Sequence, residues 1–99
     1  MAANHKLTKL LSGRTISGTS QSADHVLTVT FTDGSTLTVK TAPASTNTAA
    51  TGGTIDKVRQ QGVELDLDLK GGGSLAITTA EATSSVMLRD KDGKLEYAD

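Results

Sequence analysis

Apolar and polar residues alternate along residues 25–41, HVLTVTFTDGSTLTVKT, on both sides of a turn signal. One face of the two predicted strands carries Leu27, Val29, Phe31, Leu37 and Val39. Residues paired across antiparallel strands share a face, so Val29 must lie opposite Leu37. This register requires a three-residue loop, residues 32–34, with Gly34 in the left-handed conformation. The pattern therefore predicts a β-hairpin with a defined register.

Residues 63–77, VELDLDLKGGGSLAI, repeat this pattern around a run of three glycines. The apolar positions are Leu65, Leu67, Leu69, Leu75 and Ile77. They match the apolar positions of the first hairpin at one constant offset, and Ala42 matches Ala80. Upstream, Thr15-Ile16 and Gln21 match Thr54-Ile55 and Gln60, with one residue fewer between the segments. We therefore predict a duplicated unit of one strand plus a hairpin.

Asn4 and Gly13 are typical cap residues, and three leucines between them have helical spacing, which predicts a short helix over residues 4–12. Residues 14–21 are rich in Ser and Thr and predict an edge strand. Residues 54–62 fit either a helical turn or a strand, and the repeat favours the strand. Residues 78–85 fit one helical turn or a loop.

The chain closes with a third predicted hairpin, in which Leu88 faces Leu95 and Val86 faces Tyr97 across a four-residue loop ending in Gly93. Together the patterns predict a β-rich α+β fold. A short N-terminal helix packs on an antiparallel sheet or a small barrel-like sandwich. We expect one domain, residues 1–99, with a helix (4–12), a first β unit (14–41), a loop (42–53), a second β unit (54–79) and a C-terminal hairpin (86–97).

Composition limits the function classes. The 99 residues include two aromatics, Phe31 and Tyr97, so the core is lean, and both a monomer and a homodimer remain open. Ten basic and eleven acidic residues leave a net charge of −1 without a charged block, which disfavours nucleic acid. The chain has no Cys, no signal-peptide pattern and no membrane-span pattern, so we expect a cytoplasmic protein without a membrane partner.

Three carboxylates, Glu64, Asp66 and Asp68, fall on one face of the strand after residue 63. Such a row can bind a basic partner or a cation, or supply the acid and the base for glycoside cleavage. It can equally be a solvated sheet face balanced by a cross-strand Lys57 or Arg59, and we favour that interpretation.

Two other patterns invite a chemical interpretation. The C-terminal residues Asp90, Asp92, Gly93, Leu95 and Asp99 have the spacing of part of an EF-hand loop. The first ligand position is Leu88, however, and Asp and Gly are also what a hairpin turn requires. An outward array of Thr28, Thr30, Thr36 and Thr38 suits hydrogen bonding to a sugar or to ordered water, but Thr is also favoured on exposed strands.

His5 and His25 are the only imidazoles, and two His in a chain without Cys do not form a metal-binding signature. We therefore assign no catalytic, metal or cofactor residue, and we expect no cofactor. The hypothesis we favour is a small non-catalytic module that binds a protein partner or itself, with Glu64, Asp66 and Asp68 as the candidate interaction face. The alternative is a small hydrolase that uses the same carboxylates with His25 nearby.

Overall fold

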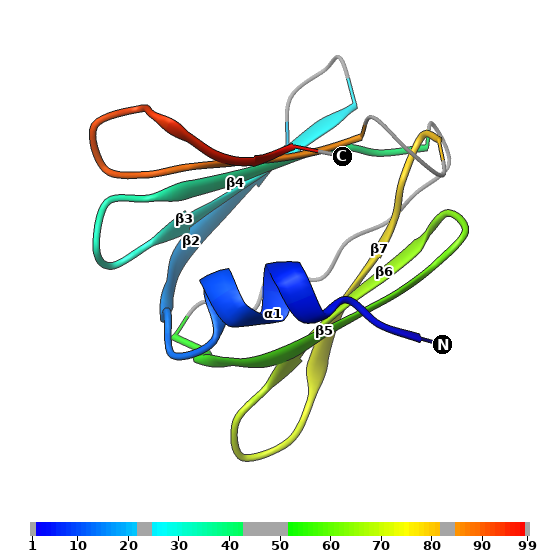
Figure 1. Cartoon of the computed structure of the whole chain (residues 1–99), viewed down its shortest axis with the longest axis horizontal. Coiled ribbons are helices and arrows are strands. Elements are labelled where there is room, and N and C mark those ends of the chain that lie inside the picture. Colours follow the sequence, from blue (N-terminus) through cyan, green and yellow to red (C-terminus); the bar gives the residue numbers. More distant parts are fainter. Residues whose placement is uncertain (1, 22–24, 43–51, 82–84, 99) are drawn as a thin grey trace.

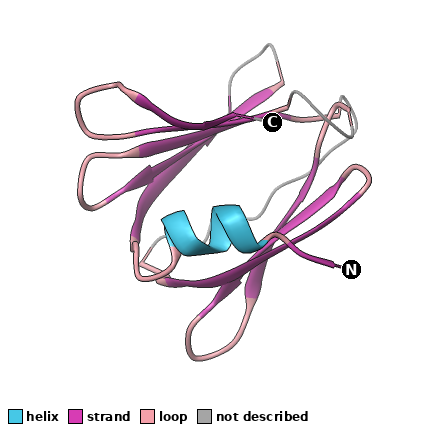
Figure 2. Ribbon diagram, in the orientation of Figure 1, coloured by secondary structure: helices cyan, strands magenta, loops and turns pink. Residues whose placement is uncertain are grey.

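A computed structural model describes residues 2–21, 25–42, 52–81 and 85–98, and their strands form two open antiparallel sheets (Figures 1 and 2). The four-stranded sheet has the order β1 (Ala2–Ala3), β5 (Ile55–Gln61), β6 (Glu64–Leu69), β7 (Ser74–Thr78). The five-stranded sheet has the order β2 (Ile16–Gln21), β3 (Val26–Phe31), β4 (Thr36–Lys40), β8 (Val86–Arg89), β9 (Leu95–Ala98). With the short helix α1 (His5–Leu11), this is the β-rich α+β class that the sequence predicts.

Helix α1 lies between the two sheets (Figure 1). The Asn4 side chain caps it by accepting the Leu7 N–H at 3.0 Å, as the sequence predicts. The same side chain donates to Gln60 on β5 at 2.9 Å and to the Tyr97 hydroxyl on β9 at 3.1 Å. Leu7 and Leu11 are fully buried, so this seven-residue helix is held by packing and by its cap.

The β3–β4 hairpin has the predicted register. Val29 lies opposite Leu37, and Leu27 lies opposite Val39. The Phe31 N–H donates to the Ser35 carbonyl at 2.9 Å and closes a three-residue loop, in which Gly34 has a φ of 91°.

The β6–β7 hairpin follows the same rule. Leu67 lies opposite Leu75, the Leu69 N–H donates to the Gly73 carbonyl at 3.0 Å, and Gly72 has a φ of 107°. Residues 55–61 form the strand β5 rather than a helical turn. Both hairpins therefore place their apolar sets on the core side, as the alternation predicts.

The first strand of each β unit carries an irregularity at the same place. On β2 the pairing passes from Ile16 opposite Phe31 to Gly18 opposite Thr30. On β5 it passes from Ile55 opposite Leu69 to Lys57 opposite Asp68. In each case one residue is bulged, and the residues on both sides of the bulge occupy matching positions in the two units.

The two sheets meet at two corners through reciprocal hydrogen bonds. At the first corner, the Ile16 N–H donates to the Gly53 carbonyl and the Ile55 N–H donates to the Arg14 carbonyl, both at 2.8 Å. The hydroxyls of Thr15 and Thr54 also lie 2.8 Å apart there.

At the second corner, the Ala42 N–H donates to the Thr78 carbonyl at 3.0 Å and the Ala80 N–H donates to the Lys40 carbonyl at 2.8 Å. Each corner therefore joins residues that occupy matching positions in the two β units. Between the corners lies one continuous core, and the side chains that fill it nearly all come from the positions that the alternation predicts.

The C-terminal hairpin forms, but its predicted register is wrong. Leu88 lies opposite Tyr97, Arg89 lies opposite Leu95, and the register shifts between these two pairs. The Asp90 N–H donates to the Lys94 carbonyl at 2.9 Å, which makes a three-residue loop instead of the expected four. Leu95 is consequently 53% exposed, because the bulge turns it to the outer face.

The sequence also makes predictions for segments that are described only in part. Residues 43–51 of the expected loop, residues 82–84 of the ambiguous segment and Asp99 lie outside the described residues. Within the described ranges, no helix has the length and hydropathy needed to span a membrane.

Candidate functional site

The predicted carboxylate row lies on the outer face of the four-stranded sheet. Strand β6 places Asp66 opposite Arg59 of β5 and Asp68 opposite Lys57. The Arg59 guanidinium donates to both carboxylate oxygens of Asp68, at 2.7 and 3.0 Å, and to Asp66 at 3.3 Å. This is the cross-strand charge balance that the sequence favours for a solvated sheet face.

The electrostatics of this cluster hold Asp68 in place. The hydrogen bond to Asp68 and the charge of that carboxylate raise the pKa of Arg59, and the charge of Asp66 adds to the effect. Asp66 and Asp68 are only 19% and 15% exposed, against 36% for Arg59. Because both Asp68 oxygens accept hydrogen bonds from one cation, this carboxylate is poorly placed to deliver or accept a proton.

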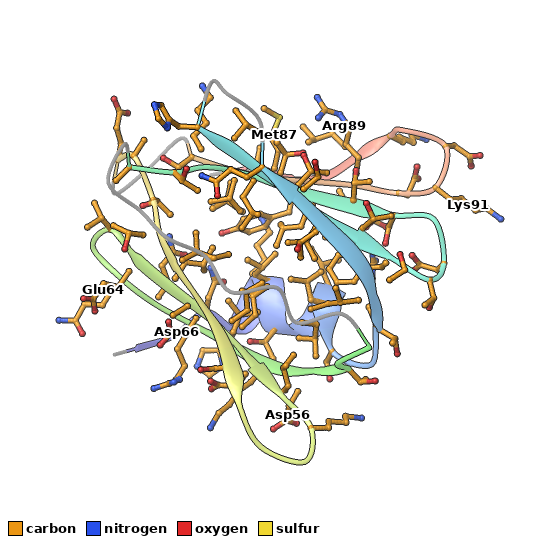
Figure 3. The ribbon with its side chains drawn as sticks, turned by 180° about the vertical axis from the view of Figure 1, so that it is seen from behind. Asp56, Glu64, Asp66, Met87, Arg89 and Lys91 are labelled. Atoms are coloured by element: carbon orange, nitrogen blue, oxygen red, sulfur yellow. The ribbon has the colours of Figure 1, made fainter. Side chains whose placement is uncertain are left out.

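Glu64 is exposed, and with Asp66 it lies across the molecule from Met87 and Arg89 of the five-stranded sheet (Figure 3). The outer face beside these carboxylates holds a shallow hollow of about 320 Å³, lined by Glu64, Asp66, Ala76, Ile77 and Thr78. Three of these five residues belong to β7, the last strand of the sheet. The hollow therefore connects the acidic face with the edge of the sheet.

The free edge of β7 exposes a row of backbone groups. The ladder with β6 includes the bond from the Leu69 N–H to the Gly73 carbonyl and the bond from the Thr79 N–H to the Val63 carbonyl. Since antiparallel ladders alternate, the N–H and C=O groups of Ser74 and Ala76 and the N–H of Thr78 point away from β6. No strand pairs with these groups within the described part of the chain.

The matching edge in the other sheet is covered. Thr36 and Thr38 of β4 occupy the positions that correspond to Ser74 and Ala76, and β8 pairs with both of them. The Lys40 N–H, which corresponds to the Thr78 N–H, donates to the Ser85 carbonyl at 2.7 Å. The two β units thus present the same row of outward backbone groups. Among the described residues, the row of the first unit is paired with β8, and the row of the second unit has no paired strand.

Strand β7 also lacks the features that protect the other edges. Strand β2 carries a bulge and Gly18, strand β9 carries a bulge and Glu96, and β1 has only two residues. By contrast, residues 71–80 contain no charged residue and no proline. Among the sheet edges that the structure describes, the edge of β7 has the fewest features that hinder the pairing of another strand.

A second charged cluster, which the sequence does not indicate, lies where three turns meet. Arg14 contacts Glu96 at 2.9 Å and Asp33 at 3.8 Å, beside a hollow of about 220 Å³. Hydrogen bonds from the Ser35 hydroxyl and N–H lower the pKa of Asp33, and the charge of Arg14 lowers it further. Arg14 is 17% exposed and ties the turns together, which is a structural task. Its partners are too far apart in the sequence for a local pattern to reveal them.

In the part of the chain that the structure describes, the remaining candidates do not gather into one site; Asp99 of the EF-hand-like pattern lies outside it. Asp90 Oδ1 accepts the N–H groups of Asp92 and Lys94, both at 2.9 Å, so the predicted turn occupies this carboxylate without a metal. Nowhere in the described ranges do three His, Asp or Glu side chains gather as a metal site. His25 precedes β3 in the other sheet, and its backbone carbonyl accepts the Thr41 N–H at 2.7 Å.

The threonine array lies on the outer face of the five-stranded sheet, where Thr28 pairs with Thr38 and Thr30 pairs with Thr36. All four residues are half-buried.

Comparison of the chain with known protein families, with curated proteins and with solved structures finds no match. The proposal of a function therefore depends on the geometry of the molecule.

Proposed function

We propose that the protein is a non-catalytic interaction module that accepts an extended strand at the edge of β7. The observation that carries this proposal is the unpaired row of backbone groups at Ser74, Ala76 and Thr78. An added strand gains hydrogen bonds from the main chain, and its side chains pack against the sheet. The hollow beside Glu64 and Asp66 offers room for the outward side chains of such a strand.

The alternative, a hydrolase that uses Glu64, Asp66 and Asp68, receives less support from the geometry. Arg59 engages two of the three carboxylates, and His25 belongs to the other sheet. A working acid or base requires a free oxygen within reach of a substrate. We therefore propose binding rather than catalysis for this face, in the cytoplasm that the sequence predicts.

We infer that the two β units arose by duplication. Their matching registers, their bulges at equivalent places and the reciprocal bonds at both corners support this inference. The equivalence has a practical consequence, because β8 on β4 then serves as a template for a strand on β7. It predicts that an incoming strand with the β8 sequence would place Arg89 opposite Ser74 and Met87 opposite Ala76.

The test is a titration of the ¹⁵N-labelled protein with a synthetic peptide of residues 85–98, the segment that covers β4. We expect shift changes and slower amide exchange at Ser74, Ala76 and Thr78, and no change on β2 or β9. Ala76→Pro should abolish the response, because proline lacks the edge N–H. Ala98→Pro is the matched control, since Ala98 is also exposed on an edge strand. With the protein dilute enough to be monomeric, no response on β7 at millimolar peptide would contradict the proposal.

A further inference from the structure

Resting on this proposed function, we propose that the strand received at β7 is the β7 strand of a second copy of the chain. The two strands pair antiparallel about a twofold axis at Ala76 and join two four-stranded sheets into one continuous sheet. Ala76 of one copy then faces Ala76 of the other, and Ser74 faces Thr78 of the second copy.

The free backbone groups of β7 are self-complementary in this register. The Ala76 N–H of each copy donates to the Ala76 carbonyl of the other, since both groups point away from β6. The Thr78 N–H of each copy donates to the Ser74 carbonyl of the other. The Thr78 carbonyl already accepts the Ala42 N–H at 3.0 Å, so the Ser74 N–H shares an acceptor there. Each copy has five free groups: the N–H and C=O of Ser74, the N–H and C=O of Ala76, and the N–H of Thr78. All of them except the Ser74 N–H gain a partner that they do not share.

The corner and the glycine turn disfavour the two other registers that place an outward residue of β7 on the twofold axis. Pairing centred on Thr78 would need the Thr78 carbonyl and the Ala80 N–H, and both are already bonded, to Ala42 and Lys40. Pairing centred on Ser74 would extend the contact into the Gly71–Gly73 turn, where the backbone leaves the strand conformation with positive φ angles. The register centred on Ala76 uses the straight part of β7 and leaves the corner bonds intact.

The side chains and charges of β7 suit a second copy. The outward residues Ser74, Ala76 and Thr78 are uncharged and short, so two such strands can approach without burying a charge. Leu75 and Ile77 point into the core and are 1% and 2% exposed. The nearest carboxylates belong to β6, three strand spacings or about 14 Å from those of the second copy. That exceeds a Debye length of about 8 Å, so their repulsion is screened at physiological salt.

Strand β8 on β4 shows that a neighbour fits at such an edge. It pairs with β4 from Thr36 to Val39 while the corner beyond Lys40 keeps its bonds to the other sheet. The corresponding length of β7 is Ser74 to Ile77. A strand of a second copy therefore meets the same local geometry that the chain already accommodates once.

Sedimentation equilibrium over a concentration series tests the inference. We expect a concentration-dependent dimer whose dissociation constant rises at least tenfold in Ala76→Pro and stays unchanged in Ala98→Pro. Ala98 is on β9, opposite Met87 of β8. Its N–H is turned away from β8, just as the Ala76 N–H is turned away from β6. Circular dichroism melts of both variants establish that they fold.

A second pair of variants covers the case in which proline disturbs the fold. Ala76→Lys leaves the backbone unchanged and sets two like charges opposite each other across the twofold axis. It should weaken the dimer about as strongly as the proline, whereas Ala98→Lys should not. In the wild-type dimer, the Ala76 and Thr78 amides should exchange more slowly as concentration rises, and the Ala98 amide should not.

The outcomes separate this inference from the proposed function. A dimer that both Ala76 variants weaken supports the two together. If the wild-type protein is a monomer at every concentration, the inference of pairing with a second copy is overturned. A response of β7 to the peptide of residues 85–98 would in that case still support the strand-accepting function. A dimer that is indifferent to both Ala76 variants uses another surface and overturns the inference. A monomer that also ignores the peptide overturns both.

Discussion

The two β units of this protein are alike on the inside and different on the outside. Both place aliphatic side chains at matching inward positions and bulge their first strand at the same place. Outside, the first unit presents threonines and has its edge covered by β8. The second presents Arg59 with its carboxylates, and no strand pairs with the outer edge of β7 among the described residues. The requirement for a shared core explains the likeness, because a register slip would expose every inward residue. The outer face is free of that requirement, so a difference in function is expected there.

The largest expected effect tests whether the two units contribute equally to the core. Phe31 is 1% exposed, while Leu69 at the matching position is only partly buried. Phe31→Ala should lower the free energy of unfolding by about 3–5 kcal/mol, and Leu69→Ala by less than about 2 kcal/mol. Urea unfolding of the two variants measures both values. Equal losses would show that the two units pack their loop ends equally well.

A smaller effect is expected at the two matching loop glycines. Gly34 and Gly72 both have positive φ angles, of 91° and 107°, so alanine at either position should cost at least about 1 kcal/mol. A Cβ on Gly34 would also lie 3.1 Å from the Lys91 Cβ, while a Cβ on Gly72 would meet open space. Gly34→Ala should therefore be the more destabilising by roughly 1 kcal/mol.

Chemical denaturation of single and double variants isolates that contact. Gly34→Ala combined with Lys91→Gly removes the close approach, so the excess cost of the alanine at position 34 should disappear. Gly72→Ala combined with Lys91→Gly should show simple additivity, because a Cβ on Gly72 would meet open space and not Lys91. If the excess cost persists without Lys91, it comes from the loop backbone and not from the contact between the two turns.

The sequence predicts the two repeated hairpins down to their registers because each rule involved is local. Strict alternation sets the buried face, and a glycine at an odd-length loop keeps both apolar sets on that face. The predicted register of the third hairpin is wrong because contacts outside the apolar pattern, some local and some distant in the sequence, decide it. Asp90 accepts two N–H groups of its own turn, and Glu96 reaches Arg14 from far along the chain. These bonds stabilise a bulge that the apolar pattern does not contain.

The candidate site shows the same division. The carboxylate row follows from alternation, and the sequence offers Lys57 and Arg59 as its cross-strand partners, but the pairing of β5 with β6 that puts Arg59 on Asp66 and Asp68 is known from the structure. The openness of the β7 edge does not follow from any local pattern. It depends on β8 pairing with β4 and not with β7. Because β4 and β7 have nearly the same spacing of polar and apolar residues, this spacing does not indicate which of them β8 joins. Strand order is a property of the whole chain, and short segments do not encode it.

The smallest expected effect separates the outer face from the fold. Arg59→Ala removes the ion pairs with Asp66 and Asp68, but these groups stay in contact with water, so the unfolding free energy should fall by less than it does in Gly72→Ala. The loss should shrink further in about 1 M salt, where the Debye length is about 3 Å. Lys57→Ala is the control on the same strand, opposite an Asp68 that Arg59 already holds. A loss as large as that of Leu69→Ala would mean that the charged face of the second unit supports the fold as the core does, and the contrast between inside and outside would then fail for that unit.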